Sequence, residues 1–183
     1  MSGSPDQSVS LTAKQFEVEV EDLLRKSGIG LLDFKVRRLE KIDAADGVYE
    51  IDVTARFEAL GGNVLVLIEC KHHKNPIKRE VVQVLYDRLR AVGGHKGMIF
   101  STAGFQRGAI EFAQAHGIAL VQVADGRTSY ATKSFGEPPP LPPWVPPYVG
   151  WIVSLSADGN ESHRLMADGD QTILLERFNE SAT

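Results

Sequence analysis

The stretch from Val48 to Lys71 constrains the fold of this chain more than any other part. It contains two runs rich in β-branched and aliphatic residues, Val48–Thr54 and Val64–Lys71, on either side of a Gly61-Gly62-Asn63 segment. Apolar, β-branched runs that flank a short glycine-containing turn are typical of a β-hairpin. The sequence therefore predicts that the two runs pair as antiparallel strands around Gly61.

Three charged side chains, Asp52, Glu69 and Lys71, interrupt this apolar hairpin. Because side chains alternate between the faces of a strand, Glu69 and Lys71 share one face, and Cys70 points to the other and is expected to be buried. Folding around Gly61 brings Asp52 opposite Glu69, to within about a residue. Isolated charges are costly to bury in such a place. Two carboxylates and an ammonium at one end of a sheet face can instead hold a divalent cation and a water molecule.

The remaining patterns predict helices and strands that alternate along the chain. A first amphipathic helix is expected from Leu11 to Ser27, with Thr12 as its N-cap and Gly28 at its end. The other expected elements are a strand over 34–39 followed by a turn-rich connection over 41–47, helices over 77–92 and 104–116, and buried strands over 97–102 and 117–123. Short strand–helix–strand connections imply right-handed crossovers. The expected class is α/β, a mixed sheet flanked by helices in the order α-β-β-β-α-β-α-β.

An ordered set of landmarks runs through these elements and resembles the PD-(D/E)xK nuclease superfamily and, within it, the Mrr-type restriction endonuclease family. The landmarks are Phe16-Glu17, Glu50-Ile51-Asp52, Ile68-Glu69-Cys70-Lys71, Pro76-Ile77, and Gly97–Thr102 with Phe105 and Ala109. The resemblance covers the chain from about Leu11 to Asp125 and implies a restriction-endonuclease-like sheet.

The same resemblance implies a Mg²⁺-dependent DNA endonuclease in which Mn²⁺ can substitute. Asp52, Glu69 and the backbone carbonyl of Cys70 would hold the metal ion, which activates a water molecule and neutralises phosphate charge. Lys71 would then stabilise the charge that develops on the phosphate. Cleavage to 5′-phosphate and 3′-hydroxyl ends is implied, in restriction of foreign or modified DNA.

Two further side chains enter this site through the resemblance. The family places a site carboxylate in its Phe-Glu pair, which makes Glu17 a candidate metal or water ligand; the alternative is a solvated acidic helix face. Several superfamily members carry a helical glutamine after the lysine strand, which makes Gln83 a candidate catalytic residue that orients the metal's water or a phosphate.

Basic and histidine side chains that follow the hairpin predict the DNA contacts. They are His72, His73, Lys74, Lys78 and Arg79. A second basic group, Lys35, Arg37 and Arg38, either protects an edge strand or touches phosphates. Double-strand cleavage needs two sites, so a homodimer is expected.

The charge distribution is compatible with DNA as a partner, although the net charge of −4 argues mildly against it. Residues 1–135 carry 18 Lys and Arg against 17 Asp and Glu, whereas residues 136–183 carry 2 against 7. The chain has no apolar run of about 18 residues and no secretory signal at its start, so a cytoplasmic protein without membrane contact is expected. Its single cysteine, Cys70, excludes an internal disulfide.

Composition divides the chain into four parts. We expect a disordered start over 1–10, a nuclease-like domain over 11–135, a proline-rich linker over 136–148 and a small β-hairpin appendage over 149–183. The appendage would contain strands over Trp151–Leu155 and Thr172–Phe178, and a chain ending near Phe135 should stay folded if its core is complete without them. Seven of the nine prolines lie between Phe135 and Pro147, which indicates a stiff arm or an SH3-type ligand.

Two other classes of function compete with the nuclease. One is a catalytically silent nucleic-acid-binding module, and the other is a protein that binds a partner through the proline-rich arm and the acidic C-terminal segment. The intact Asp52, Glu69 and Lys71 favour the enzyme, because carboxylates repel phosphate and would not help a simple binder.

Overall fold

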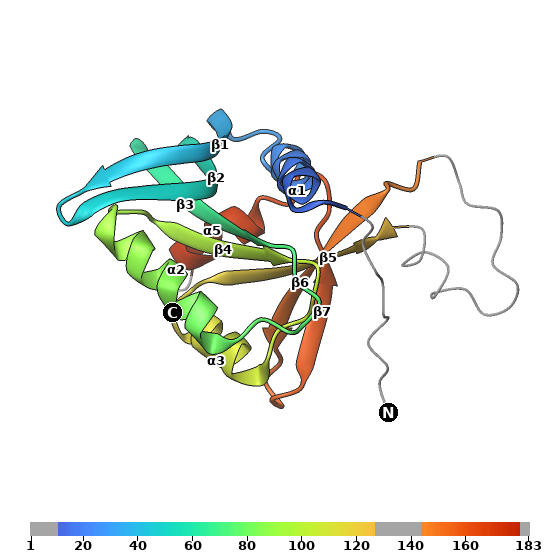
Figure 1. Ribbon diagram of the computed structural model, residues 1–183. Helices are drawn as coiled ribbons and strands as arrows, with labels where there is room; N and C mark the ends of the chain where they lie inside the picture. Colours follow the sequence, from blue (N-terminus) through green and yellow to red (C-terminus); the bar gives the residue numbers. More distant parts are fainter. Residues whose placement is uncertain (1–10, 127–143, 180–183) are drawn as a thin grey trace, which may run out of the picture.

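A seven-stranded mixed sheet runs through the molecule in the order β1-β2-β3-β4-β5-β6-β7 (Figure 1). The computed structural model describes residues 11–126 and 144–179, with side chains as far as residue 175. The elements are α1 (Ala13–Ser27), β1 (Leu32–Ala44), β2 (Gly47–Ala59), β3 (Gly62–Lys71), α2 (Arg79–Ala91), β4 (Lys96–Ser101), α3 (Arg107–Ala115), β5 (Ala119–Asp125), β6 (Tyr148–Leu155), β7 (Glu161–Leu165) and α5 (Thr172–Asn179). The predicted order α-β-β-β-α-β-α-β is confirmed over the first eight.

Parallel pairing is confined to the centre of the sheet. β3, β4 and β5 run parallel, joined through α2 and α3, whereas the pairs at both ends are antiparallel. Parallel strands have their carboxyl ends at one edge, so the ends of β3 and β4 meet there, with Lys71 beside Ser101.

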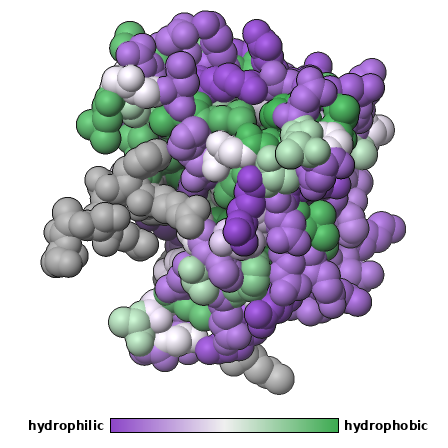
Figure 2. Space-filling model, turned by 90° about the vertical axis from the view of Figure 1, so that its left-hand side faces the viewer, coloured by the Kyte–Doolittle hydropathy of each residue, from purple (hydrophilic) through white to green (hydrophobic). Residues whose placement is uncertain are grey.

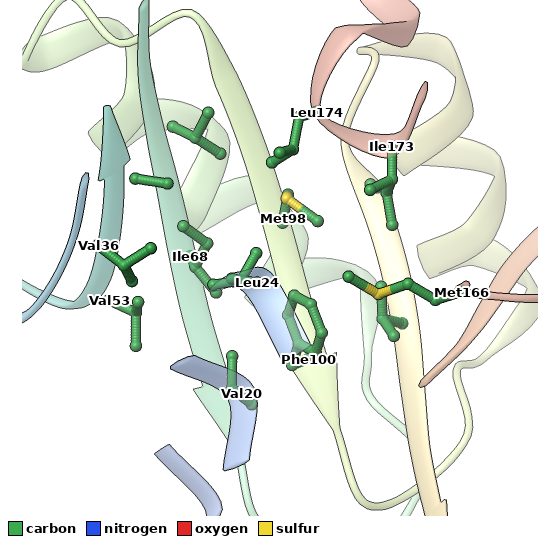
Figure 3. Close-up of a cluster of buried hydrophobic side chains, with 14 of the residues drawn as sticks. Val20, Leu24, Val36, Val53, Ile68, Met98, Phe100, Met166, Ile173 and Leu174 are labelled. Carbon is green, nitrogen blue, oxygen red and sulfur yellow. The ribbon is translucent and has the colours of Figure 1, made fainter. Parts of the chain in front are cut away.

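Helices cover both faces of the sheet and divide the core into two clusters. On one face, Phe16, Val20 and Leu24 of α1 pack with residues of the strands and with α5 (Figure 3). On the other face, α2 and α3 pack over β3, β4, β5 and β6. The sheet is thus the middle of three layers.

Local sequence explains how α1 is placed. Thr12 and Gln15 form a capping box, in which Gln15 N–H donates to Thr12 Oγ1 at 3.2 Å and Thr12 N–H donates to Gln15 Oε1 at 2.8 Å. The helix ends at Gly28, where a Cβ atom would come within 2.2 Å of the Phe34 ring. Glycine therefore lets the Phe34 ring of β1 lie against the end of α1, and a larger residue would push that ring aside.

The central hairpin turns one residue earlier than predicted. Ala59 pairs with Gly62, and the two residues between them, Leu60 and Gly61, have φ angles of 52° and 75°. Positive φ at both central positions is the geometry of a type I′ turn, which matches the twist of the flanking strands. Leu60 adopts it at a fully exposed position.

Two expectations for residues 11–126 are wrong. β1 does not end at Leu39 but continues to Ala44, so the predicted connection over 41–47 is mostly strand. Cys70 was expected to be buried and is only partly so.

The described part of the predicted C-terminal appendage belongs to the main sheet and core. β6 pairs with β5 through six residue pairs, so the strands of the sheet are continuous. Residues 172–178, predicted as a strand, form the helix α5, whose Ile173 and Leu174 are fully buried. The domain boundary stays a prediction, and the expected disordered start and most of the predicted linker lie outside the described residues.

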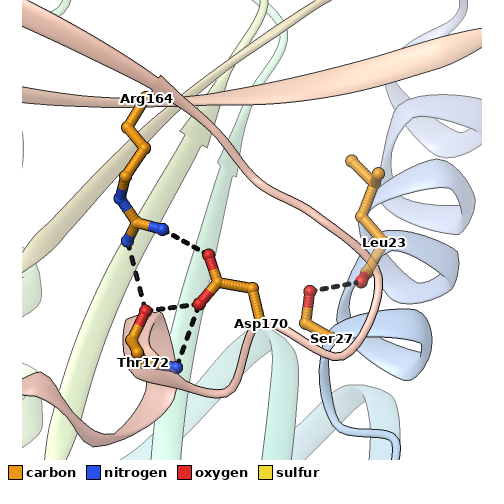
Figure 4. A network of polar contacts seen from close by, with 5 residues as sticks. All are labelled: Leu23, Ser27, Arg164, Asp170 and Thr172. Carbon is orange, nitrogen blue, oxygen red and sulfur yellow. Dashed lines mark hydrogen bonds and ion pairs between the residues drawn. The ribbon is translucent and has the colours of Figure 1, made fainter.

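Polar contacts order the start of α5, which lies near the end of α1 (Figure 4), and backbone contacts join the two. Asp170 accepts hydrogen bonds from Arg164 and from the Thr172 hydroxyl, which fixes the start of α5. Gly169 N–H donates to the carbonyl of Lys26 at 2.9 Å, and Gln171 Nε2 donates to the carbonyl of Ile29 at 2.7 Å. Leu174 and α1 are thereby held on the same sheet face.

The side of the molecule that carries the tip of the β1–β2 hairpin is mainly hydrophilic (Figure 2). Within residues 11–126 and 144–179, no helix has the length and apolar character needed to cross a bilayer.

We expect Leu174→Ala to lower the free energy of unfolding by about 2–5 kcal/mol, because it leaves a cavity in the core beside β4 and α1. Leu165→Ala is the matched control: this leucine is 43% exposed and should change stability by less than about 1 kcal/mol. Guanidinium unfolding followed by circular dichroism measures both. If Leu174→Ala changed the free energy of unfolding as little as Leu165→Ala does, the α5 region would be an independent appendage.

Candidate active site

The candidate site lies where β2 separates from β3. The last pair in their register is Val53 with Ile68, so Asp52 stands opposite Glu69 one step further on, as predicted. There the Asp52 side chain takes over the pairing, and its Oδ2 accepts the N–H of Cys70 at 2.8 Å. The carboxylate is thus held at the edge of β3 by a backbone donor that would otherwise lack a partner.

The break has a counterpart in β1. Leu39, which lies between the pairs Arg38–Val53 and Glu40–Ile51, has a φ of 51°. Val53 packs in the cluster under α1, whereas Ile51 packs in the cluster under α2. Residues two apart on a regular strand share a face, so both strands switch faces at the level of Leu39 and Asp52.

Glu69 lies at the centre of a buried charge cluster. Its side chain is only 10% exposed, and each of its oxygens accepts a cationic donor: Lys71 Nζ lies 2.6 Å from Oε1, and Arg88 Nη1 lies 2.9 Å from Oε2. Lys71 itself is held by the end of its strand, since its carbonyl accepts the N–H of Thr102 at 3.1 Å. The structure therefore brings Asp52, Glu69 and Lys71 together.

Burial raises the pKa of Asp52, an effect that the hydrogen bond from Cys70 N–H opposes and the nearby charge of Glu69 reinforces. Burial also raises the pKa of Glu17, with the charge of Asp52 as the next cause. The negative charge of Asp52 therefore acts on the Glu17 carboxyl group. No described contact joins its carboxylate to Asp52 or Glu69, and among the described residues no three His, Cys, Asp or Glu side chains gather closely enough to form a metal site.

The oxygen donors at this place are of the kind that a divalent cation binds. Asp52 Oδ1 has no described hydrogen-bond partner, and Cys70 directs its carbonyl to the same strand edge as the N–H that Asp52 accepts. Hard oxygen donors of this kind suit Mg²⁺. Glu69 already accepts one cationic donor on each of its oxygens, so a metal ion there would compete with Lys71 and Arg88 for its charge.

Gln83 lies on the wrong flank of α2 for this site. Arg79, Gln83, Tyr86 and Arg90 share a flank by their helical spacing, and Tyr86 makes an edge contact with the Phe112 ring of α3. Within the described chain no contact joins Gln83 to Asp52, Glu69 or Lys71. Arg88, on the opposite flank, contacts Glu69 instead, and sequence reasoning missed it. Arg88 lies one helical turn after Val84 and Leu85, and this spacing, which puts the three on one side of the helix, could have identified it.

The predicted DNA-contacting residues are spread over two surfaces. The His72 ring lies 6.1 Å from the ring of Phe16, the residue before Glu17. The backbone N–H of His73 donates to the Thr102 hydroxyl, which donates in turn to the His73 carbonyl. Lys74 and Lys78 are exposed on the loop before α2. Arg79 instead points toward α3, where its guanidinium carbon lies 5.1 Å from the centre of the Phe112 ring. His72, His73 and Lys74 are the three that follow the site directly.

The partly exposed Cys70 has its thiol pKa raised well above the usual value, first by burial and then by the charge of Asp52. A raised pKa leaves little thiolate, which is the reactive form. We therefore expect Cys70 of the native protein to react slowly with thiol reagents.

We expect Asp52→Asn to raise the melting temperature of the metal-free protein near neutral pH, and the gain to shrink as the pH falls. Because folding raises the pKa of Asp52, its ionised form destabilises the fold. This penalty is complete above the folded pKa and absent below the unfolded value, where both states are protonated. Asparagine can still accept the N–H of Cys70.

Thermal melts in EDTA between about pH 4 and pH 8 measure this dependence. The control is Asp87→Asn, which changes an exposed aspartate on α2. A gain for Asp52→Asn that stays constant, or that grows toward acid pH, would contradict the buried-charge description.

Comparison with known proteins identifies the family. Residues 9–126 match the sequence model of the Mrr_cat restriction endonuclease family. Among solved structures, the protein of unknown function AF1548 is 27% identical, with a TM-score of 0.48, over 59% of this chain and 56% of that one. The DNA modification-dependent restriction endonuclease AspBHI is 19% identical, with a TM-score of 0.39, over 58% of this chain and 27% of that one.

No curated protein matches the sequence. The chain spans little more than half of AF1548 and about a quarter of AspBHI. The family match extends from before α1 to the end of β5 and covers well over half of the 183 residues. The chain thus belongs to the Mrr-type restriction endonuclease family.

Proposed function

We propose that the protein is a metal-dependent deoxyribonuclease that hydrolyses phosphodiester bonds within DNA. The observation that carries the proposal is the convergence of Asp52, Glu69 and Lys71 where β2 leaves β3, in a chain of the Mrr-type restriction endonuclease family. Charged groups at a buried strand end are costly unless they are compensated, and a charged ligand can share in that compensation. A phosphate and a cation are ligands that use both signs of charge.

Asp52 and the carbonyl of Cys70 would hold Mg²⁺, with Glu69 as the third donor. A bound Mg²⁺ supplies a water of lowered pKa and neutralises charge on the phosphate oxygens. Asp52 is fixed for this role by the Cys70 N–H, so little reorganisation is needed on binding. Glu17, which the family resemblance adds to the site, would orient a water molecule beside them.

Lys71 would act on the phosphate and on the attacking water. Lys71 lies on the same strand face as Glu69, and its ammonium donates a hydrogen bond to Glu69 Oε1. This bond keeps the ammonium at the site. A cation fixed in this way stabilises charge that develops in the transition state.

DNA is the proposed substrate, with His72, His73 and Lys74 at the exit of β3 as its first contacts. Two copies of the chain would be needed to cut both strands, and restriction of foreign or modified DNA is the proposed purpose. A catalytic role for Gln83 rests on resemblance alone.

One observation favours a second function, a nucleic-acid-binding module without catalysis. Both oxygens of Glu69 are already engaged by Lys71 and Arg88, so the described site is complete as a salt-bridge network. In that case the cluster would be structural, and metal ions would change neither DNA binding nor DNA integrity.

We expect Lys71→Ala to slow DNA cleavage roughly 10²–10³-fold, the usual effect of deleting an electrostatic group that acts in the transition state. DNA affinity should fall only about tenfold, as for one lost phosphate contact. Nicking of supercoiled plasmid in Mg²⁺ measures the first, and fluorescence anisotropy in EDTA measures the second.

Lys41→Ala is the matched control, because Lys41 is 70% exposed and its nearest carboxylate, on Glu50, is 3.8 Å away. It should leave cleavage unchanged. If Lys71→Ala cuts as fast as the wild type in Mg²⁺, the site is misplaced. If the wild type cuts no DNA with any divalent metal, the binding module is the better description.

A further inference from the structure

Arg88 has no place in the family pattern that identified the site, yet it contacts the central carboxylate. It comes from α2, on the face of the sheet that Leu85 and Leu89 pack against, and its guanidinium donates to Glu69 Oε2 at 2.9 Å. Asp52, Glu69, Lys71 and Arg88 together carry two negative and two positive charges when ionised. The site is therefore balanced without a metal ion.

The two cations differ in how easily they can leave Glu69. Lys71 is two residues away on the same strand, with its backbone fixed by Thr102, so it stays near Glu69. Arg88 reaches across from another element, its side chain is 32% exposed, and only one of its donors is used on Glu69. A guanidinium has five N–H donors and a long, flexible stem. Arg88 is the partner that can be displaced into solvent or onto a phosphate.

We propose that Arg88 is a positioning residue that holds Oε2 of Glu69 and competes with the divalent cation for the Glu69 carboxylate. Arg88 keeps the buried carboxylate oriented before metal binding, and its positive charge opposes the entry of a second cation. The inference deepens the proposed function and rests on it, since it assumes that Glu69 is a metal ligand.

The consequence is a metal affinity that Arg88 holds down. Removing a positive charge a few ångströms from a divalent cation removes both repulsion and a competitor. We expect Arg88→Ala to bind Mn²⁺ about tenfold more tightly than the wild type in the absence of DNA. Arg88→Lys keeps the charge and should stay close to the wild type.

Free Mn²⁺ measured by electron paramagnetic resonance gives the affinity without any need for catalysis. Wild type, Arg88→Ala, Arg88→Lys and Asp52→Asn are titrated side by side, and Arg90→Ala is the matched control. Arg90 is exposed on the opposite flank of α2, over the Tyr86 ring at 5.9 Å, and its removal should leave Mn²⁺ affinity unchanged. Thermal melts in EDTA and in Mn²⁺ show whether each variant is folded; the gain on adding Mn²⁺ should be larger for Arg88→Ala than for the wild type.

The outcomes separate the inference from the function on which it rests. If Asp52→Asn loses the Mn²⁺ site but Arg88→Ala binds no more tightly than the wild type, the inference is wrong and the metal site stands. If Arg88→Lys gains affinity as Arg88→Ala does, shape rather than charge is responsible and the inference is also wrong. If neither the wild type nor Arg88→Ala binds Mn²⁺, the metal site fails, and the inference fails with it.

Discussion

The hydrogen bond from Cys70 N–H to the Asp52 carboxylate holds the candidate site together. Backbone pairing of β2 and β3 stops at Val53 and Ile68, which would leave the edge of β3 without a partner just where its charged residues begin. Asp52 Oδ2 fills that gap at 2.8 Å. A side-chain oxygen thus takes the place of a main-chain acceptor. This arrangement leaves the second oxygen of Asp52 and the carbonyl of Cys70 at the same strand edge.

Burial explains the other charges. Glu69 sits in a sheet that helices cover on both faces, where an uncompensated carboxylate would be strongly destabilising. Lys71 and Arg88 satisfy its two oxygens from the strand and from α2. If Glu69 binds a metal ion as proposed, the pairing that stabilises the metal-free fold competes with the cation, so fold stability and metal affinity would oppose each other at this residue.

The sequence predicts the elements whose signals are local. Alternation around Gly61, the Thr12 cap and the spacing of Phe16, Val20 and Leu24 lead to the hairpin, to α1 and to the pairing of Asp52 with Glu69. It could not show that α2 turns Arg88 rather than Gln83 toward Glu69, because that choice depends on how the helix is rotated over the sheet. It also mistook residues 172–178 for a strand, since Ile173 and Leu174 are apolar neighbours whose burial comes from docking beside α1.

Anomalous X-ray diffraction from crystals soaked in Mn²⁺ tests most directly whether Asp52, Glu69 and Cys70 form a metal site. We expect one anomalous peak between the Asp52 carboxylate and the Cys70 carbonyl, about 2–2.4 Å from each, with Arg88 moved off Glu69. A soaked crystal with Asp52 and Arg88 unchanged and no peak at the end of β3, or with its only peak elsewhere, would contradict it.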